Sequence, residues 1–148
     1  MDKTDSILSR NTQTALSYLK YIAAGSGKEG RAAFDKAFSL VSEDFEIEVM
    51  PSSLKMSRMK LKPYRAWLEP MVNDMFVTFE ANIINTTAQD NRVVIEATSR
   101  AKTKDGRDYG QQYFLAFEFN ESGKIRQVKE FTDSLYSSKF YTKKERPK

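Results

Sequence analysis

Residues 91–132 carry the strongest structural signal in the chain, NRVVIEATSRAKTKDGRDYGQQYFLAFEFNESGKIRQVKEFT. Apolar and polar residues alternate with period two through much of this stretch, and the pairs Asp105-Gly106 and Ser122-Gly123 interrupt the alternation. Such pairs between alternating segments are typical of β-hairpin turns, and Asp-Gly is among the strongest signals. With Gln89-Asp90 as a third turn, we predict strands at 76–86, 91–102, 107–119 and 124–132 in one antiparallel meander.

The residues that precede the meander predict helices. Apolar residues recur at helical spacing over 8–22, after a cap at Thr4 or Asp5, and again over 34–41. A short strand follows at 45–49, and Pro63 opens a third helix that Pro70 is expected to kink. Helices followed by antiparallel strands predict an α+β domain in which the helices cover one face of the sheet.

Composition excludes several kinds of chemistry. The 148 residues include no cysteine and no histidine, which excludes Cys/His zinc patterns, thiol nucleophiles, disulfides and histidine-based triads. No calcium-loop spacing and no glycine-rich phosphate loop occurs in the sequence. We therefore expect one domain over 1–148 with no metal and no cofactor, and any acid–base chemistry must come from Asp, Glu, Tyr or Lys.

The net charge of +4 comes from the C-terminus. The last ten residues hold five basic residues and one acid, and the remaining chain is neutral. A neutral body does not resemble a nucleic-acid-binding domain, and we expect residues 142–148 to form a disordered basic tail. No apolar run approaches the roughly 18 residues of a membrane span, and the first ten residues are polar. These features predict a cytoplasmic protein without a membrane segment or signal peptide.

The two hairpins place a set of polar side chains on one face of the sheet. If each turn has two residues, Gln111 lies opposite Arg100, and Glu130 lies opposite Leu115. The shared face then carries Glu96, Thr98, Arg100, Tyr109, Gln111, Tyr113, Leu115, Phe117, Val128 and Glu130. The opposite face carries Val93, Ile95, Ala97, Phe114, Ala116 and Phe131, with the charged residues Glu118 and Lys129 among them. The polar face is either exposed to solvent, as in many antiparallel sheets, or the lining of a small-molecule pocket.

The whole arrangement resembles the NTF2-like superfamily, and in particular its SnoaL-like branch. The resemblance covers roughly residues 8–141 and rests on the element order, on 123–125 (GKI) and on 130–133 (EFTD). Further segments are similar to fungal secondary-metabolite members, which include meroterpenoid isomerases and the brevianamide semipinacolase. These segments are 49–54 (VMPSSL), 109–113 (YGQQY) and 130–137 (EFTDSLYS).

This resemblance implies a cone-shaped α+β barrel with a pocket between the curved sheet and the helices, assembled as a homodimer. It implies cofactor-independent isomerisation, cyclisation or rearrangement by acid–base chemistry. It also places catalysis at Tyr109, Tyr113 and Glu130.

The chemistry of these three residues fits such a role. Burial of Glu130 would raise its pKa toward the range of a general acid or base. Tyr109 and Tyr113, roughly 13 Å apart at Cα, can bracket a mid-sized polycyclic substrate. Ketosteroid isomerase, a relative in fold, works with tyrosine and carboxyl groups. The structural alternative is that both tyrosines are packed with satisfied hydroxyls and that Glu130 pairs with Arg100.

A second set of residues is predicted to bind the substrate: Arg100, Gln111, Glu96, Asp133, Phe117, Trp67 and Phe38. Arg100 and Gln111 would orient the substrate or tune Glu130, and Glu96 is either a second carboxylate or a partner of Arg100. Asp133 fits a helix N-cap as well as a catalytic role.

We therefore predict an isomerase or cyclase that rearranges a polycyclic intermediate of indole alkaloid or meroterpenoid biosynthesis. The alternative is a non-catalytic NTF2-like module that binds a ligand or a protein, because this fold hosts both. The apolar set on the face opposite the pocket further predicts a homodimer through that face.

Overall fold

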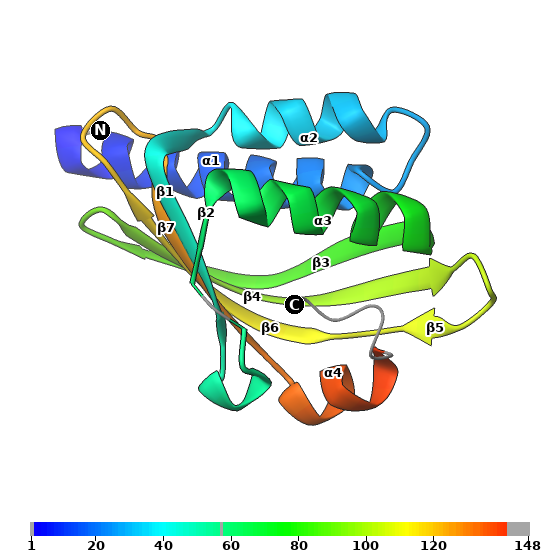
Figure 1. Ribbon diagram of the computed structural model, residues 1–148. Coiled ribbons are helices and arrows are strands. Elements are labelled where there is room, and N and C mark those ends of the chain that lie inside the picture. The colour runs from blue at the N-terminus through cyan, green and yellow to red at the C-terminus, as the bar shows by residue number, and fades with distance from the viewer. Residues whose placement is uncertain (1, 57, 142–148) are drawn as a thin grey trace.

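Three helices lie over one face of a curled sheet in the computed structural model, which describes residues 2–56 and 58–141 (Figure 1). They are α1 (Lys3–Ala24), α2 (Gly30–Phe38) and α3 (Leu61–Met75), and a short helix α4 (Ser134–Phe140) follows the last strand. The tail expected at 142–148 lies outside the described residues. Within the described ranges, no helix is long and apolar enough to cross a membrane.

The sheet of the described chain has seven strands: β1 (Val41–Met50), β2 (Met59–Lys60), β3 (Phe76–Gln89), β4 (Arg92–Thr103), β5 (Asp108–Tyr109), β6 (Gln112–Phe119) and β7 (Ile125–Thr132). Their order is β2-β1-β7-β6-β4-β3, with β5 paired to β4. The meander from β3 to β7 is antiparallel, and β1 joins it by parallel pairing with β7. The predicted α+β cone, with a curved sheet under N-terminal helices, is confirmed.

The element boundaries differ from the sequence pattern in a few places. The N-cap of α1 is Asp2 rather than Thr4 or Asp5, because the Asp2 carboxylate accepts the backbone N–H of Thr4 at 2.6 Å. Helix α2 ends before Val41, which is the first residue of β1. Helix α3 continues past Pro70. The segment between β1 and β2 contains one 3-10 turn, η1 (Ser52–Leu54).

The hairpin between β4 and β5 has three loop residues, where the sequence predicted two. The Thr103 backbone N–H donates to the Arg107 carbonyl at 2.9 Å, and Gly106 has a φ of 90°. A three-residue loop with a residue at positive φ is the next most common hairpin geometry after the two-residue turn. The extra residue shifts β4 by one position against β6, so that Leu115 pairs with Ile95.

This shift inverts the predicted faces of β4, because side chains alternate along a strand. Val93, Ile95 and Ala97, predicted to face outward, are buried on the inner face. Glu96 and Arg100, predicted on the pocket face, lie on the outer face. Their predicted part in substrate binding is therefore wrong.

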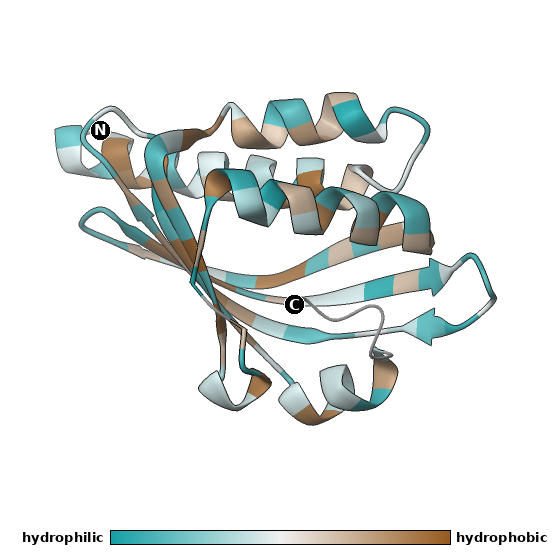
Figure 2. Cartoon of the chain, in the orientation of Figure 1, coloured by the Kyte–Doolittle hydropathy of each residue, from teal (hydrophilic) through white to brown (hydrophobic). Residues whose placement is uncertain are grey.

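The core lies between the helices and the inner face of the sheet (Figure 2). Phe117 of β6 is fully buried there, and Phe38 of α2 packs edge-on against Tyr18 and Tyr64. Neither Phe117 nor Phe38 lines the cavity described below. Both residues, predicted to bind substrate, belong to the hydrophobic core instead.

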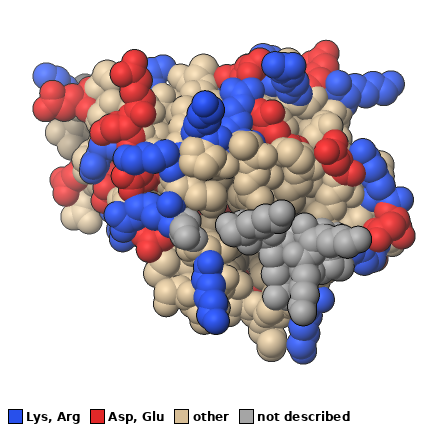
Figure 3. All heavy atoms as spheres, in the orientation of Figure 1, with Lys and Arg blue, Asp and Glu red and all other residues tan. Residues whose placement is uncertain are grey.

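The basic segment around β2 pairs with acids on β1. Lys60 lies 2.5 Å from a Glu46 carboxylate oxygen, and Arg58 lies 3.2 Å from one of Glu48. On the face seen in Figure 3, acidic and basic side chains are likewise intermixed around a centre of uncharged side chains. These contacts favour a solvated structural role for Arg58 and Lys60.

Candidate functional site

A cavity of about 750 Å³ lies between the inner face of the sheet and the helices. Helices α1 and α3 give it an apolar wall of Leu19, Ile22, Leu68, Met71 and Val72. The region around α4 contributes hydroxyl groups from Ser53, Thr132, Ser134, Ser137 and Ser138. Apolar walls with a few polar groups are typical of small-molecule sites. This cavity is lined by Tyr109, Tyr113 and Glu130. Of the two interpretations of the polar face, exposure to solvent or the lining of a pocket, these three residues therefore fit the pocket.

Glu130 is the single carboxylate among the described residues that line the cavity. It lies on β7, next to Leu115 of β6 and Val49 of β1. Within residues 2–56 and 58–141 it forms no ion pair or hydrogen bond, and Arg100 is on the other side of the sheet. Burial raises the pKa of Glu130 to about 7. A carboxyl group in this state can both donate and accept a proton near neutral pH.

Four tyrosines lie within electrostatic range of Glu130. They are Tyr18 of α1, Tyr64 of α3, Tyr109 of β5 and Tyr113 of β6. Burial raises the pKa of each phenol, and the negative charge of Glu130 raises it further. Their hydroxyls therefore stay protonated at neutral pH, a state in which a phenol can donate a hydrogen bond but cannot serve as a base.

Tyr113 has a polar partner that the sequence analysis missed. Its hydroxyl lies 3.1 Å from Oγ of Ser99, a residue of β4 that is 7% exposed. Ser99 also lines the cavity. The predicted two-residue turn placed Ser99 on the outer face of the sheet. A prediction with the correct three-residue turn would have placed Ser99 on the inner face, beside Tyr113.

Tyr109 lies in an aromatic cluster at one side of the cavity. Its ring is 4.7 Å from that of Phe140 and 5.5 Å from that of Phe76, measured between centroids. Its side chain is 6% exposed. The ring is held firmly by its neighbours, as a donor with a fixed position requires.

Gln111 does not line the cavity and instead fixes the start of α4. Its Nε2 donates to the Asp133 carbonyl at 3.1 Å and to Ser137 Oγ at 2.8 Å. Its Oε1 accepts the backbone N–H groups of Asp133 and Gln112 at 3.0 and 2.8 Å. Asp133 is the N-cap of α4 and accepts the Tyr136 N–H at 3.1 Å. Both Gln111 and Asp133, predicted to contact substrate, shape the cavity through α4 instead.

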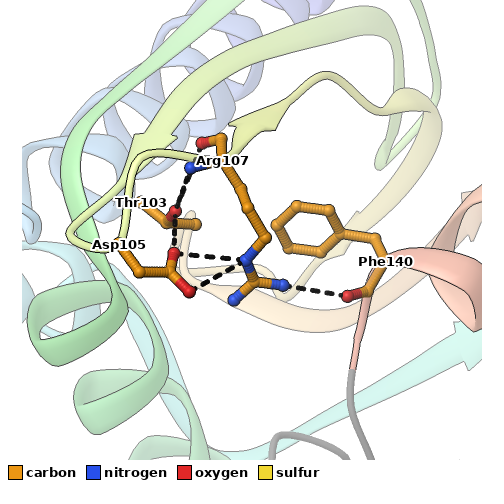
Figure 4. A network of polar contacts seen from close by, with 4 residues as sticks. All are labelled: Thr103, Asp105, Arg107 and Phe140. Carbon is orange, nitrogen blue, oxygen red and sulfur yellow. Dashed lines mark hydrogen bonds and ion pairs between the residues drawn. The ribbon is translucent and has the colours of Figure 1, made fainter.

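The β4–β5 hairpin fixes the other end of α4 (Figure 4). Arg107 donates from Nη1 to the Phe140 carbonyl at 3.1 Å, and its guanidinium lies 4.8 Å from the centre of the Phe140 ring. Asp105 accepts from Arg107 Nε at 3.1 Å. The three-residue turn that sets the register of β4 thus also positions the cavity wall formed by α4.

Replacing Gln111 by Leu is expected to destabilise the fold by about 3 kcal/mol. The change removes four partly buried hydrogen bonds at the start of α4, each with a net contribution of about 0.5–1.5 kcal/mol. Urea denaturation followed by circular dichroism measures the loss. Gln112→Leu, at an exposed neighbouring position, is the control and should change stability by about 0.5 kcal/mol or less. Equal stability of the two variants would contradict this role.

Of the residues that were predicted to bind substrate without acting in catalysis, Trp67 of α3 is the one that lines the cavity. It packs against Tyr64, with ring centroids 6.1 Å apart. Elsewhere in the described chain, no group of three acidic side chains is placed to hold a metal ion.

No family model matches the chain, and no curated protein matches it in sequence. The BvnE pinacolase from Penicillium brevicompactum has a TM-score of 0.76 at 22% identity, over 89% of this chain and 92% of that one. PrhC from Penicillium brasilianum has a TM-score of 0.77 at 13% identity, over 90% and 86%. A protein named as a SnoaL-like polyketide cyclase, from Jannaschia sp. CCS1, has a TM-score of 0.71 at 15% identity, over 93% and 94%.

Sequence identities of 13–22% establish a shared fold and not a shared reaction. Two further similar structures are NTF2-like proteins of unknown function. The curled sheet and its three covering helices match this group in architecture. The chain therefore has the cone-shaped NTF2-like fold of the SnoaL-like proteins.

Proposed function

We propose that the protein is a cofactor-independent isomerase or cyclase that rearranges a polycyclic intermediate of secondary metabolism. The observation that carries the proposal is an unpaired, half-buried carboxyl group, Glu130, facing a cavity of about 750 Å³ with apolar walls. A pKa of about 7 suits this group to proton transfer in both directions. The fold shared with a pinacolase and with a SnoaL-like polyketide cyclase supports the same class of chemistry.

The proposed reaction divides into a proton transfer and the stabilisation of charge on oxygen. In a semipinacol-type step on a hydroxy epoxide, Glu130 accepts the hydroxyl proton as that oxygen becomes a carbonyl, and the migrating C–C bond forms at the neighbouring epoxide carbon as its C–O bond breaks. The opened epoxide oxygen takes the electron pair and then the proton held by Glu130. Tyr109 and Tyr113 donate hydrogen bonds to the oxygen on which negative charge develops. In a ring isomerisation, the same carboxyl group removes a proton from one carbon and returns it to another. Both routes conserve the mass of the substrate.

The substrate is tested by deletion of the gene in its host and isolation of the metabolite that accumulates. Purified protein is then added to that metabolite in the presence of a chelator and without cofactors. We expect a product of unchanged mass and altered chromatographic retention. A product that gains the mass of one water would replace the isomerase assignment with a hydrolase. Binding of the metabolite without conversion would favour the ligand-binding module instead.

The two tyrosine donors are tested by Tyr109→Phe and Tyr113→Phe. Each change removes one donor from a site that keeps the other, so we expect kcat to fall by roughly 10- to 100-fold, less than for loss of the carboxyl group. Tyr21→Phe, outside the cavity lining, is the matched control and should keep wild-type turnover. Full activity of both site variants would show that the hydroxyls only pack.

We also propose a homodimer through the outer face of the sheet, where Phe114 and Phe131 remain from the predicted apolar set. Phe114 and Phe131 lie opposite each other on β6 and β7, are 55% and 45% exposed, and have Met50 beside them on β1. Exposed apolar patches of this kind mark association surfaces. Sedimentation at micromolar concentration should give twice the 17.0 kDa chain mass. The Phe114→Lys variant should sediment as a monomer. A wild-type species of 17.0 kDa contradicts the dimer, and Phe114→Leu serves as the control.

A further inference from the structure

We infer that Ser99 is a positioning residue that turns the hydroxyl proton of Tyr113 toward the cavity. The inference rests on the proposed function for its catalytic consequence, whereas the direction of the hydrogen bond is a property of the folded chain alone. Two consecutive hydrogen bonds join the Gln111 backbone to Ser99 and Ser99 to Tyr113.

Ser99 forms hydrogen bonds to neighbouring residues of the sheet through its backbone N–H and its Oγ. Its backbone N–H donates to the Gln111 carbonyl at 2.9 Å, and its Oγ accepts the Gln111 N–H at 3.1 Å. The remaining partner of its Oγ in the described chain is the Tyr113 hydroxyl, at 3.1 Å. Ser99 is 7% exposed, and Gln111 is 1% exposed. The bridge is therefore built into the interior.

The direction of the Ser99–Tyr113 hydrogen bond follows from the number of protons. A hydroxyl group carries one proton and two lone pairs. If Tyr113 donated to Ser99, Ser99 would accept twice, and its own proton would have no acceptor among the described residues. If Ser99 donates to Tyr113, the Ser99 proton is satisfied and the Tyr113 proton is left to point into the cavity. One hydroxyl proton lacks a protein acceptor in either direction, and this costs less on half-buried Tyr113 than on Ser99, which is 7% exposed, so we assign Ser99 as the donor.

This direction makes Tyr113 a stronger donor to a bound substrate. A hydrogen bond to the phenol oxygen favours the ionised form, so it lowers the pKa of Tyr113 against the increase caused by burial and by Glu130. The hydrogen bonds run one way, from Gln111 N–H through Ser99 to Tyr113, and bonds aligned in this way strengthen one another. The other titratable groups that act on Tyr113 are Glu130 on β7 and Tyr141 after α4, which raise its pKa, and the Tyr109 hydroxyl on β5, which hydrogen-bonds Tyr113 and lowers it.

The test places 3,5-difluorotyrosine at position 113, where its ionisation is followed by ultraviolet absorbance. The titration midpoint is compared in the parent, Ser99→Ala, Ser99→Thr and Ser42→Ala. Loss of the Ser99 donor should raise the midpoint by about one pH unit, and threonine, which keeps the hydroxyl, should hold it near the parent value. Ser42 is a buried β1 serine bonded to Asp44 and away from the cavity, so Ser42→Ala should leave the midpoint unchanged.

The sign of the shift decides the inference. A lowered midpoint in Ser99→Ala shows that Tyr113 donates to Ser99, and an unchanged midpoint shows that the contact is inert; either result overturns the assignment. If Ser99→Ala does not fold, Ser99→Cys supplies the weak-donor comparison. With a substrate in hand, Ser99→Ala should lower kcat about tenfold at unchanged KM, with rescue by threonine. If the wild-type protein does not rearrange the substrate, the proposed function is overturned, but the direction of the hydrogen bond measured by titration is unaffected.

Discussion

Replacing Glu130 by Gln is expected to lower kcat by roughly 10²–10⁴-fold while the fold stays intact. Glutamine has nearly the same shape but can neither accept nor deliver the proton, and no other carboxylate among the described residues lines the cavity. Because a buried carboxyl group is replaced by a neutral amide, folding itself should not suffer. Turnover of the accumulated intermediate measures the first effect, and circular dichroism verifies the second.

Glu96→Gln is the matched control for this experiment. Glu96 lies on the outer face of β4, where it pairs with Asn85 of β3 and Phe114 of β6. The same loss of a carboxylate there should leave turnover unchanged. A folded Glu130→Gln protein with wild-type turnover would remove the acid–base assignment and put the ligand-binding module first.

The architecture was predictable from local signals. The period-two alternation after residue 76, the turn pairs and the helical stripes each gave the right kind of element. These signals are local in sequence, because side-chain alternation and turn residues act over a few positions. The parallel pairing of β1 with β7 was not predictable in this way, since it joins segments about 80 residues apart.

The residues of the site were predicted correctly only on strands whose pairing register was predicted correctly. For β6 and β7 the prediction was right, and Glu130 pairs with Leu115. Yet that hairpin also has three loop residues, with the Asn120 N–H donating to the Lys124 carbonyl at 2.9 Å. A register shift after Glu118 cancels the extra residue. No such shift interrupts the pairing of β4 with β5 and β6, so one extra residue exchanged its two faces.

The side-chain contacts around α4 show a second limit of sequence reasoning. Gln111 lies between two cavity-lining tyrosines, and by alternation it shares their face. The strand is interrupted between β5 and β6, and at this break the amide turns to the backbone of Asp133. An interruption of this kind depends on the packing of α4, which local patterns do not encode.

Stability should depend on pH through Glu130, the same carboxyl group that we propose for catalysis. The pKa of Glu130 is about 7 in the folded protein and has its ordinary value of 4.5 when the chain is unfolded. Below pH 4.5 both states are protonated, and the fold keeps its full stability. As pH rises from 4.5 to 7, the unfolded state releases its proton first, so the free energy of unfolding falls, by on the order of 2–3 kcal/mol in total. Urea denaturation at a series of pH values measures this loss.

The Glu130→Gln variant isolates this effect because glutamine does not titrate. Relative to wild type, the variant should gain stability as pH rises from 4.5 to 7 and keep a constant advantage above it, since only the wild-type chain must bury an ionised carboxyl group. Glu96→Gln, on the outer face, should follow the wild-type curve. Parallel wild-type and Glu130→Gln curves over this range would mean that water or a counter-charge reaches Glu130 in the folded protein. The carboxyl group would then be ionised well below neutral pH, and its use as a general acid would lose its physical basis.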